Sequence, residues 1–160
     1  FEETGKTFAE NAFLKAEAAC RQTGKPAVAD DSGLVVDALN GAPGIYSARY
    51  AGEGASDIDR INKILRELKD VPEEQRTAKF VCSICCVYPD GRKILSQGEC
   101  KGKIAFEPYG NNGFGYDPIF LVGGKSFAQL TQTEKNAISH RGCALRKFVE
   151  QLKQMKENNS

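Results

Sequence analysis

The stretch Lys79-Phe-Val-Cys-Ser-Ile-Cys-Cys-Val-Tyr88 and the tripeptide Pro89-Asp90-Gly91 that follows it decide the fold of this chain. The first stretch is almost continuously apolar and contains the β-branched and aromatic residues that favour strands. The tripeptide consists of residues that prefer tight turns. We therefore predict a β-hairpin in which Thr77–Tyr88 pairs with Arg92–Cys100.

Helices are predicted on both sides of this hairpin in the sequence. Thr7 and Glu10 have the spacing of a capping box, which predicts that a helix covers Phe8–Thr23. A second helix is expected to begin at Ser56, and a third to run over residues 139–155, because apolar residues recur there at spacings of three and four.

Shorter apolar runs predict further strands at residues 27–29, 34–39, 103–106 and 118–122. Strands and helices thus follow one another along the chain, with at least one hairpin. This order predicts an α/β fold with a mixed β-sheet flanked by helices. A length of 160 residues fits a single domain over residues 1–160.

The composition excludes several classes of partner. The 22 basic and 21 acidic side chains nearly cancel, which argues against nucleic acid as a main partner. No apolar run approaches the roughly 20 residues that a membrane helix needs, and no signal peptide opens the chain, so we expect a cytoplasmic location. The first residue is Phe1 rather than Met, and we expect the domain to be N-terminally incomplete.

Six cysteines raise the alternative of a zinc or redox site. Cys82 and Cys85 form a C-x-x-C pair, but they lie in the predicted strand, where residues three apart point to opposite faces. One ion cannot be chelated in that way, and no second C-x-x-C is present. We therefore interpret the cysteines as small buried hydrophobic residues.

The segment Asp30-Asp31-Ser32-Gly33 is the first candidate site. We expect the strand at Ala27–Ala29 to end there and to lead into a glycine turn. Adjacent carboxylates at such a point repel each other unless a cation joins them, which suggests a hard ion such as Mg²⁺. The alternative is a simple turn, in which Asp and Ser bond to their own backbone.

Three further clusters contain residue types with chemical potential: Glu2-Glu3-Thr4-Gly5, the loop Gly113-Phe-Gly-Tyr-Asp-Pro118, and Lys135-Asn136 together with Ser139-His140-Arg141. Each also has an ordinary structural interpretation, such as a helix cap, a core aromatic or a solvated charge. Together with Lys15 they supply what a nucleoside triphosphate requires: carboxylates for Mg²⁺, cations for phosphate, and an aromatic ring for a base. No Walker loop or dinucleotide-binding fingerprint is present.

Five segments carry a resemblance to a known family: Thr7-Phe8-x-x-Asn11-Ala12-x-x-Lys15-Ala16, Ala29–Leu34, Gly44-Ile-Tyr-Ser-Ala-Arg-Tyr-Ala-Gly52, Gly113–Phe120 and Lys135–Arg141. In this order, from about Glu2 to Leu152, they resemble the inosine/xanthosine triphosphate pyrophosphatase family, also called Ham1-like or non-canonical purine NTP pyrophosphatases.

The resemblance implies an elongated α/β fold with a mixed sheet and two lobes around a nucleotide cleft. It implies a hydrolase that converts ITP, dITP and XTP to the monophosphate and diphosphate with Mg²⁺, usually as a homodimer. By motif match, Asp31 would be the catalytic base and a metal ligand, together with Glu3 and Asp30. The substrate-binding residues would be Lys15, Ser32, Phe114, Gly115, Tyr116, Asp117, Lys135, His140 and Arg141.

One departure from the family pattern keeps an alternative open. Members normally begin with a strand and a Ser/Thr-x-Asn-x-x-Lys loop that grips the triphosphate, and this chain shows no such segment before Phe1. The alternative function is therefore a catalytically impaired, dimerising nucleotide-binding fragment. A Maf-like nucleotide pyrophosphatase is a second alternative, which the Ser139-His140-Arg141 motif fits less well.

Overall fold

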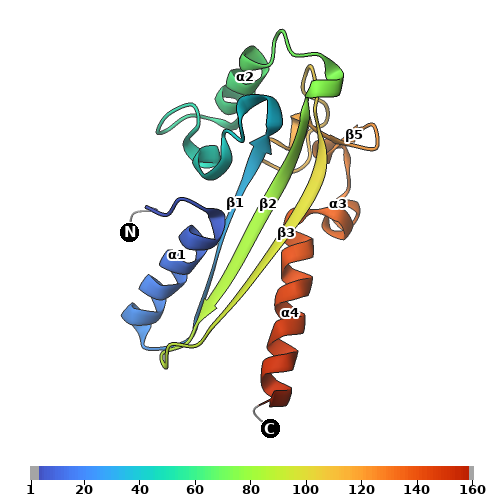
Figure 1. The fold of residues 1–160 in the computed structure, drawn as a ribbon. Coiled ribbons are helices and arrows are strands. Elements are labelled where there is room, and N and C mark those ends of the chain that lie inside the picture. The colour runs from blue at the N-terminus through green and yellow to red at the C-terminus, as the bar shows by residue number, and fades with distance from the viewer. Residues whose placement is uncertain (1–3, 159–160) are drawn as a thin grey trace. The chain divides into compact units, whose positions relative to one another are not determined.

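The computed structural model describes residues 4–158, and Figure 1 shows their helices and strands. The chain divides into two compact units, which are described separately here. Unit 1 consists of Phe1–Ser32, Val81–Glu99 and Ser139–Ser160, and unit 2 consists of Gly33–Phe80 and Cys100–Ile138.

Five strands form one sheet in the order of the sequence: β1 (Ala27–Val36), β2 (Thr77–Val87), β3 (Lys93–Ile104), β4 (Phe120–Val122) and β5 (Lys125–Ser126). Neighbouring strands run in opposite directions (Figure 1), as in the β3–β4 pair, where Lys103 lies opposite Leu121. The predicted α/β class, the helices beside the sheet and the β2–β3 hairpin are confirmed. Within residues 4–158 the sheet is antiparallel rather than mixed, since the direction of the strands alternates across it (Figure 1).

Helix α1 covers Phe8–Thr23, the predicted range. The Thr7 hydroxyl accepts a hydrogen bond from the Glu10 N–H at 3.0 Å, and the Glu10 carboxylate accepts one from the Lys6 N–H at 2.6 Å. The expected cap is thus present, with its second bond one residue earlier than in a standard capping box. The helix ends at Gly24, whose φ of 68° is accessible to glycine at little cost.

Unit 1 has apolar clusters on both faces of its part of the sheet. On one face, α1 packs on β2 through Ala12, Ala16, Cys20, Cys85 and Val87. On the other face, α4 (His140–Asn158) packs on β2 and β3 through Cys82, Ile84, Cys86, Ile94, Ala144 and Phe148. Alternate residues of β2 therefore serve opposite faces, as a strand requires. The cysteines are free and mostly buried, as predicted.

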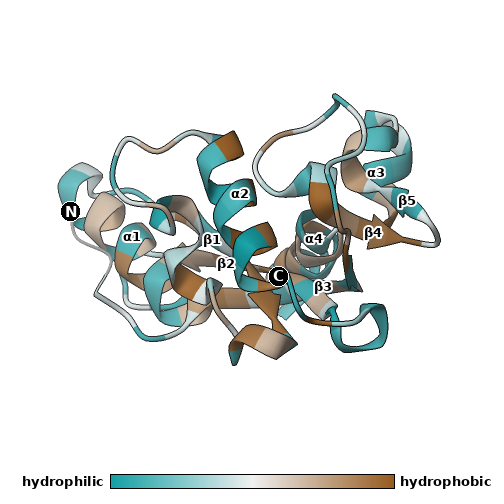
Figure 2. Ribbon diagram, turned by 90° about the horizontal axis from the view of Figure 1, so that it is seen from above, coloured by the Kyte–Doolittle hydropathy of each residue, from teal (hydrophilic) through white to brown (hydrophobic). Residues whose placement is uncertain are grey.

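Unit 2 is built around helix α2 (Asp57–Glu67) and a cluster of aromatic rings. Ser56 and Asp59 form a reciprocal capping box at the start of α2, which confirms the predicted helix start. The ring centroid of Phe80 lies 4.3 Å from that of Phe120 and 5.5 Å from that of Phe127. Figure 2 shows the apolar colour gathered on β2 and β4.

Helix α3 (Gln132–Ile138) was not predicted. Residues 103–106 do not form the expected separate strand, because Lys103 and Ile104 are the end of β3 and the next two residues lie outside any strand. Arg76 is almost completely buried and donates hydrogen bonds to the carbonyls of Leu68, Val71 and Ala105. No helix within residues 4–158 combines the length and apolar character needed to cross a membrane.

Candidate functional site

The segment Asp30-Asp31-Ser32-Gly33 lies in the middle of a continuous strand, not in a turn. Strand β1 runs without interruption from Ala27 to Val36, and Gly33 is not among the glycines with positive φ. At this edge of the sheet the Leu34 N–H donates to the Ser47 hydroxyl at 2.9 Å. The Leu34 N–H thus finds an acceptor outside the strand, and no turn forms at Gly33. The expectation that the strand ends at a Ser-Gly turn is therefore wrong.

Strand geometry separates the two carboxylates. Asp31 faces α1, where its carboxylate lies 3.3 Å from the Lys15 ammonium, and its side chain is only 9% exposed. Asp30 faces α4, where its carboxylate lies 3.2 Å from the Arg141 guanidinium, and its side chain is 48% exposed. Adjacent residues of a strand point to opposite faces, so Asp30 and Asp31 do not face one common ion. The two carboxylates of this dipeptide therefore do not form a joint metal site.

Arg141 and Asp30 belong to a polar cluster on the α4 face of unit 1. Ser32 lies on this face beside the thiol of Cys82, and both Asp30 and Arg141 act on that thiol electrostatically. Burial raises the pKa of the Cys82 thiol above its usual value, which keeps it protonated and weakly reactive. His140 is partly buried at the first turn of α4. The sequence-predicted residues Asp30, Ser32, His140 and Arg141 thus belong to one unit.

Unit 2 holds the remaining described candidates, and Asp117 organises them. Its Oδ2 atom accepts a hydrogen bond from the Lys135 ammonium at 2.6 Å and one from the Phe114 N–H at 3.1 Å. Gly113 is required at this turn, because its φ is +75° and a Cβ atom there would lie 2.2 Å from Asp117 Oδ2. Asp117 and Lys135 are both buried, so the pair fixes the loop from within.

The aromatic residues of this loop have different surroundings. The Phe114 ring is 64% exposed, with the Lys135 ammonium 4.7 Å from its centroid. Tyr116 is buried, and its hydroxyl donates to the Ser47 carbonyl at 2.6 Å. Burial also raises the pKa of Tyr116 far above its usual value. Phe114 is therefore the exposed ring of the loop, whereas Tyr116 anchors the loop to the Ser47 carbonyl.

Sequence reasoning missed one residue of this loop's surroundings. The Asp57 carboxylate, at the first turn of α2, accepts a hydrogen bond from the Gly115 N–H at 3.0 Å. Together with the Arg60 guanidinium, this bond lowers the pKa of Asp57. The sequence indicated only that Ser56 begins a helix, and nothing in the spacing links Asp57 to a glycine 58 positions later.

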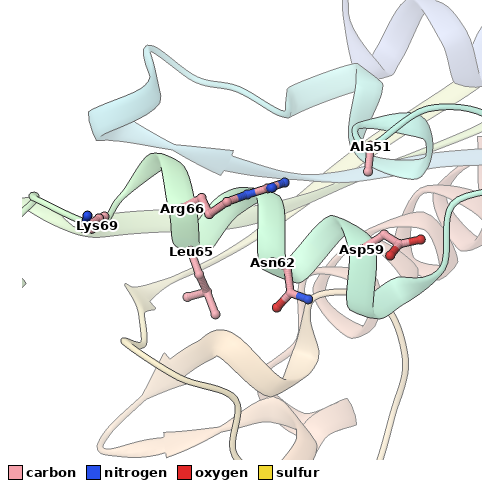
Figure 3. Close-up of a pocket in the computed structure, with 6 residues that line it drawn as sticks. All are labelled: Ala51, Asp59, Asn62, Leu65, Arg66 and Lys69. Carbon is pink, nitrogen blue, oxygen red and sulfur yellow. The ribbon is translucent and has the colours of Figure 1, made fainter.

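A groove of about 710 Å³ lies beside α2, lined by Ala51, Asp59, Asn62, Leu65, Arg66 and Lys69 (Figure 3). None of the sequence-predicted site residues lines it. Glu3, the expected metal ligand, lies outside the described residues. Within residues 4–158, no three His, Cys, Asp or Glu side chains gather as a complete metal site.

The chain is similar to proteins with known names. The sequence model of the Ham1 family matches residues 1–151. A dITP/XTP pyrophosphatase from Idiomarina loihiensis is 56% identical over 155 residues, covering 94% of this chain and 77% of that protein. A dITP/XTP pyrophosphatase from Bacillus cereus is 52% identical, covering 94% of this chain and 76% of that protein.

Solved structures agree with the sequence comparison. A HAM1 protein from Coxiella burnetii matches with a TM-score of 0.91 and 49% identity, covering 96% of this chain and 80% of that one. The Ham1 protein of Staphylococcus aureus matches with a TM-score of 0.88 and 49% identity, covering 99% and 81% of the two chains. Because the family match extends over nearly the whole sequence, the chain belongs to the Ham1 family.

Proposed function

We propose that this protein hydrolyses the purine nucleoside triphosphates ITP, dITP and XTP to the monophosphate and diphosphate. Relatives with 52–56% identity are named dITP/XTP pyrophosphatase. The observation that carries the proposal is the Asp31–Lys15 pair, a nearly buried carboxylate on a strand with a cation 3.3 Å away. Neither an impaired binding fragment nor a Maf-like enzyme is favoured by a specific observation.

The residues around Asp31 fit a magnesium ion that binds together with the phosphates of a nucleotide. Mg²⁺ is commonly held by one or two carboxylates and by the phosphates of the substrate, rather than by a complete protein cage. Asp31, with Glu3, would hold it, and among residues 4–158 no three His, Cys, Asp or Glu side chains gather as a complete protein cage. When bound, the ion supplies charge neutralisation at the phosphates and a more acidic water.

Asp31 is the proposed general base. Its carboxylate accepts the proton of the water that attacks the phosphorus atom, and diphosphate leaves in line with the attack. The Lys15 ammonium has three N–H donors, so it can hold Asp31 and also donate to a phosphate oxygen. The helix α1 and strand β1 that carry these two side chains keep the base in place.

Two side chains have the chemistry to contact a purine base. Phe114 offers an exposed ring for stacking, which favours any planar base. Arg141 has only N–H donors, which suit the oxygen at position 6 of hypoxanthine and xanthine and not the amino group of adenine. His140 precedes Arg141 in the sequence, and Ser32 lies with Arg141 beside the Cys82 thiol. We propose that both residues also contact the nucleotide. We further propose that the protein acts as a homodimer in the cytoplasm.

The test is the release of diphosphate from ITP, XTP, dUTP, GTP and ATP, with Mg²⁺ and with a chelator. We expect turnover of ITP and XTP that the chelator abolishes and that exceeds turnover of ATP. Equal turnover of all five nucleotides would contradict the proposed substrate class. Light scattering in solution tests the proposed dimer.

A further inference from the structure

We propose that Asp57 is a positioning residue, which fixes the Gly113–Asp117 loop and thereby orients Phe114 toward the nucleobase. The role of the loop in base binding rests on the proposed function, whereas the fixing of the loop can be tested without any substrate. Asp57 lies at the start of α2, and the loop follows more than fifty residues later, so the contact is a tertiary one.

Both oxygens of the Asp57 carboxylate are engaged. Oδ2 accepts the Gly115 N–H at 3.0 Å, and Oδ1 forms an ion pair with the Arg60 guanidinium. Arg60 in turn donates to the carbonyls of Ala48 and Ala55, at 3.2 Å and 2.8 Å. The carboxylate is thus held in one orientation by a group that is itself fixed to the segment preceding α2.

Two consecutive loop residues attach the loop to the start of α2 and to the segment before it. The Gly115 N–H bonds to Asp57, and the Tyr116 hydroxyl bonds to the Ser47 carbonyl. On the other side, the N–H of Phe114 bonds to Asp117. The amides before and after the Phe114 side chain are therefore both fixed, one by Asp117 and one by Asp57.

These hydrogen bonds explain how the exposed Phe114 ring keeps a defined position. The Phe114 ring is 64% exposed, so core packing does not hold it. Gly115 has a φ of +61° and no atom within 4 Å of an ideal Cβ, so side-chain packing does not restrain this residue either. Two hydrogen bonds restrain the Phe114–Gly115 peptide: its N–H donates to the Asp57 carboxylate, and its carbonyl accepts from the Asp117 N–H at 3.2 Å. The bond to Asp57 is the one that ties this peptide to helix α2. If the loop were mobile, Phe114 would bind a base more weakly, because the loop would lose conformational entropy when the base binds.

The start of α2 offers a matched control. Asp59 is also acidic and in the first turn, and it accepts the Ser56 N–H as part of the capping box. It forms no described contact with the loop. Asp59→Ala therefore removes a capping bond and a charge from this helix start. Asp57→Ala also removes a charge, and with it the ion pair with Arg60 and the contact with Gly115. Asp57→Asn keeps an oxygen acceptor of the same shape and is the conservative variant.

The first experiment measures amide hydrogen exchange by NMR without ligand. In Asp57→Ala we expect exchange at Gly115 about ten- to hundredfold faster, the range for loss of a hydrogen bond to a charged group. In Asp59→Ala exchange at Gly115 should stay near the wild-type rate, and Asp57→Asn should restore most of the protection. Exchange at Ile64, in the middle of α2, reports any opening of the helix itself.

The second experiment separates the base from the phosphates. In Asp57→Ala we expect KM for ITP to rise about tenfold, whereas kcat and the inhibition constant of inorganic tripolyphosphate change little. Asp59→Ala should leave all three constants near their wild-type values. A parallel loss of ITP and tripolyphosphate binding, or the same change in both variants, would overturn the inference.

The two experiments distinguish the failure of each proposal. Unchanged exchange at Gly115 in Asp57→Ala overturns the positioning role, whatever the enzyme hydrolyses. If exchange at Gly115 is faster in Asp57→Ala but the wild-type protein does not hydrolyse ITP, the proposed function is overturned. The orientation of Phe114 toward a base then fails with it, whereas the role of Asp57 in fixing the loop is retained.

Discussion

Asp30 and Asp31 are neighbours in the sequence, but their carboxylates lie on opposite faces of strand β1 and pair with cations of different helices. Asp31 pairs with Lys15 of α1, and Asp30 pairs with Arg141 of α4. The alternation of a strand thus turns one acidic dipeptide into two separate ion pairs. The two residues are therefore expected to respond differently to the same substitution.

Asp31→Asn should lower kcat for ITP by about 10²–10⁴-fold, because the amide cannot accept the proton of the attacking water. Asp30→Asn should lower kcat far less, because its carboxylate lies on the other face and is half exposed. Initial rates of diphosphate release from both variants, with circular dichroism as the folding control, check this prediction. Equal losses of kcat would show that the two carboxylates act at one centre.

Arg141→Ala should lower kcat/KM more for ITP than for ATP. The guanidinium donates only, so its loss removes a favourable contact with a 6-oxo group and relieves an unfavourable one with a 6-amino group. We expect the selectivity between ITP and ATP to fall by about ten- to hundredfold, the range for one polar contact. Arg141→Lys, which keeps a donor, should retain part of that selectivity. Equal losses for the two nucleotides would show that Arg141 does not distinguish position 6.

Much of the fold follows from local patterns in the sequence. Helix α1 has its predicted bounds because its cap, its small-residue face and its terminal glycine all indicate the same helix. The hairpin of β2 and β3 follows from a turn signal between two apolar runs. Helix α3 was not predicted because its seven residues show no sustained apolar period. Tertiary contacts stabilise it instead, such as the bond from Lys135 to Asp117.

The candidate site was predictable in its residue types but not in its geometry. The motifs identified Asp31, Lys15 and Phe114, because each is recognisable by its neighbours in the sequence. The expected turn at Gly33 was wrong because the local signal of Asp, Ser and Gly was overridden by strand pairing and by a bond from Leu34 to Ser47. Contacts such as this one join distant parts of the chain, and no local pattern contains them.

Arg76→Met should destabilise the protein by about 3 kcal/mol. The side chain is 2% exposed, and its guanidinium satisfies the carbonyls of Leu68, Val71 and Ala105. Methionine fills much of the volume but leaves these acceptors without that donor, at roughly 1 kcal/mol each. Urea unfolding measures the loss, and Arg66→Met, a change on the open groove of α2, is the control. Equal stabilities of the two variants would contradict the prediction.

The acid side of the stability profile should depend on Asp57. The hydrogen bond from the Gly115 N–H lowers the pKa of Asp57 below its usual value, and the Arg60 guanidinium lowers it further by a smaller amount. A carboxyl group with a lowered pKa in the folded state stabilises that state above its unfolded pKa of about 4, and the contribution disappears as the pH falls through the folded pKa. Between pH 7 and pH 2, the free energy of unfolding should therefore fall less steeply in Asp57→Asn than in the wild-type protein. Urea unfolding at several pH values measures both slopes. A variant whose profile runs parallel to that of the wild-type protein below pH 4 would show that the carboxylate and Gly115 are not coupled in solution.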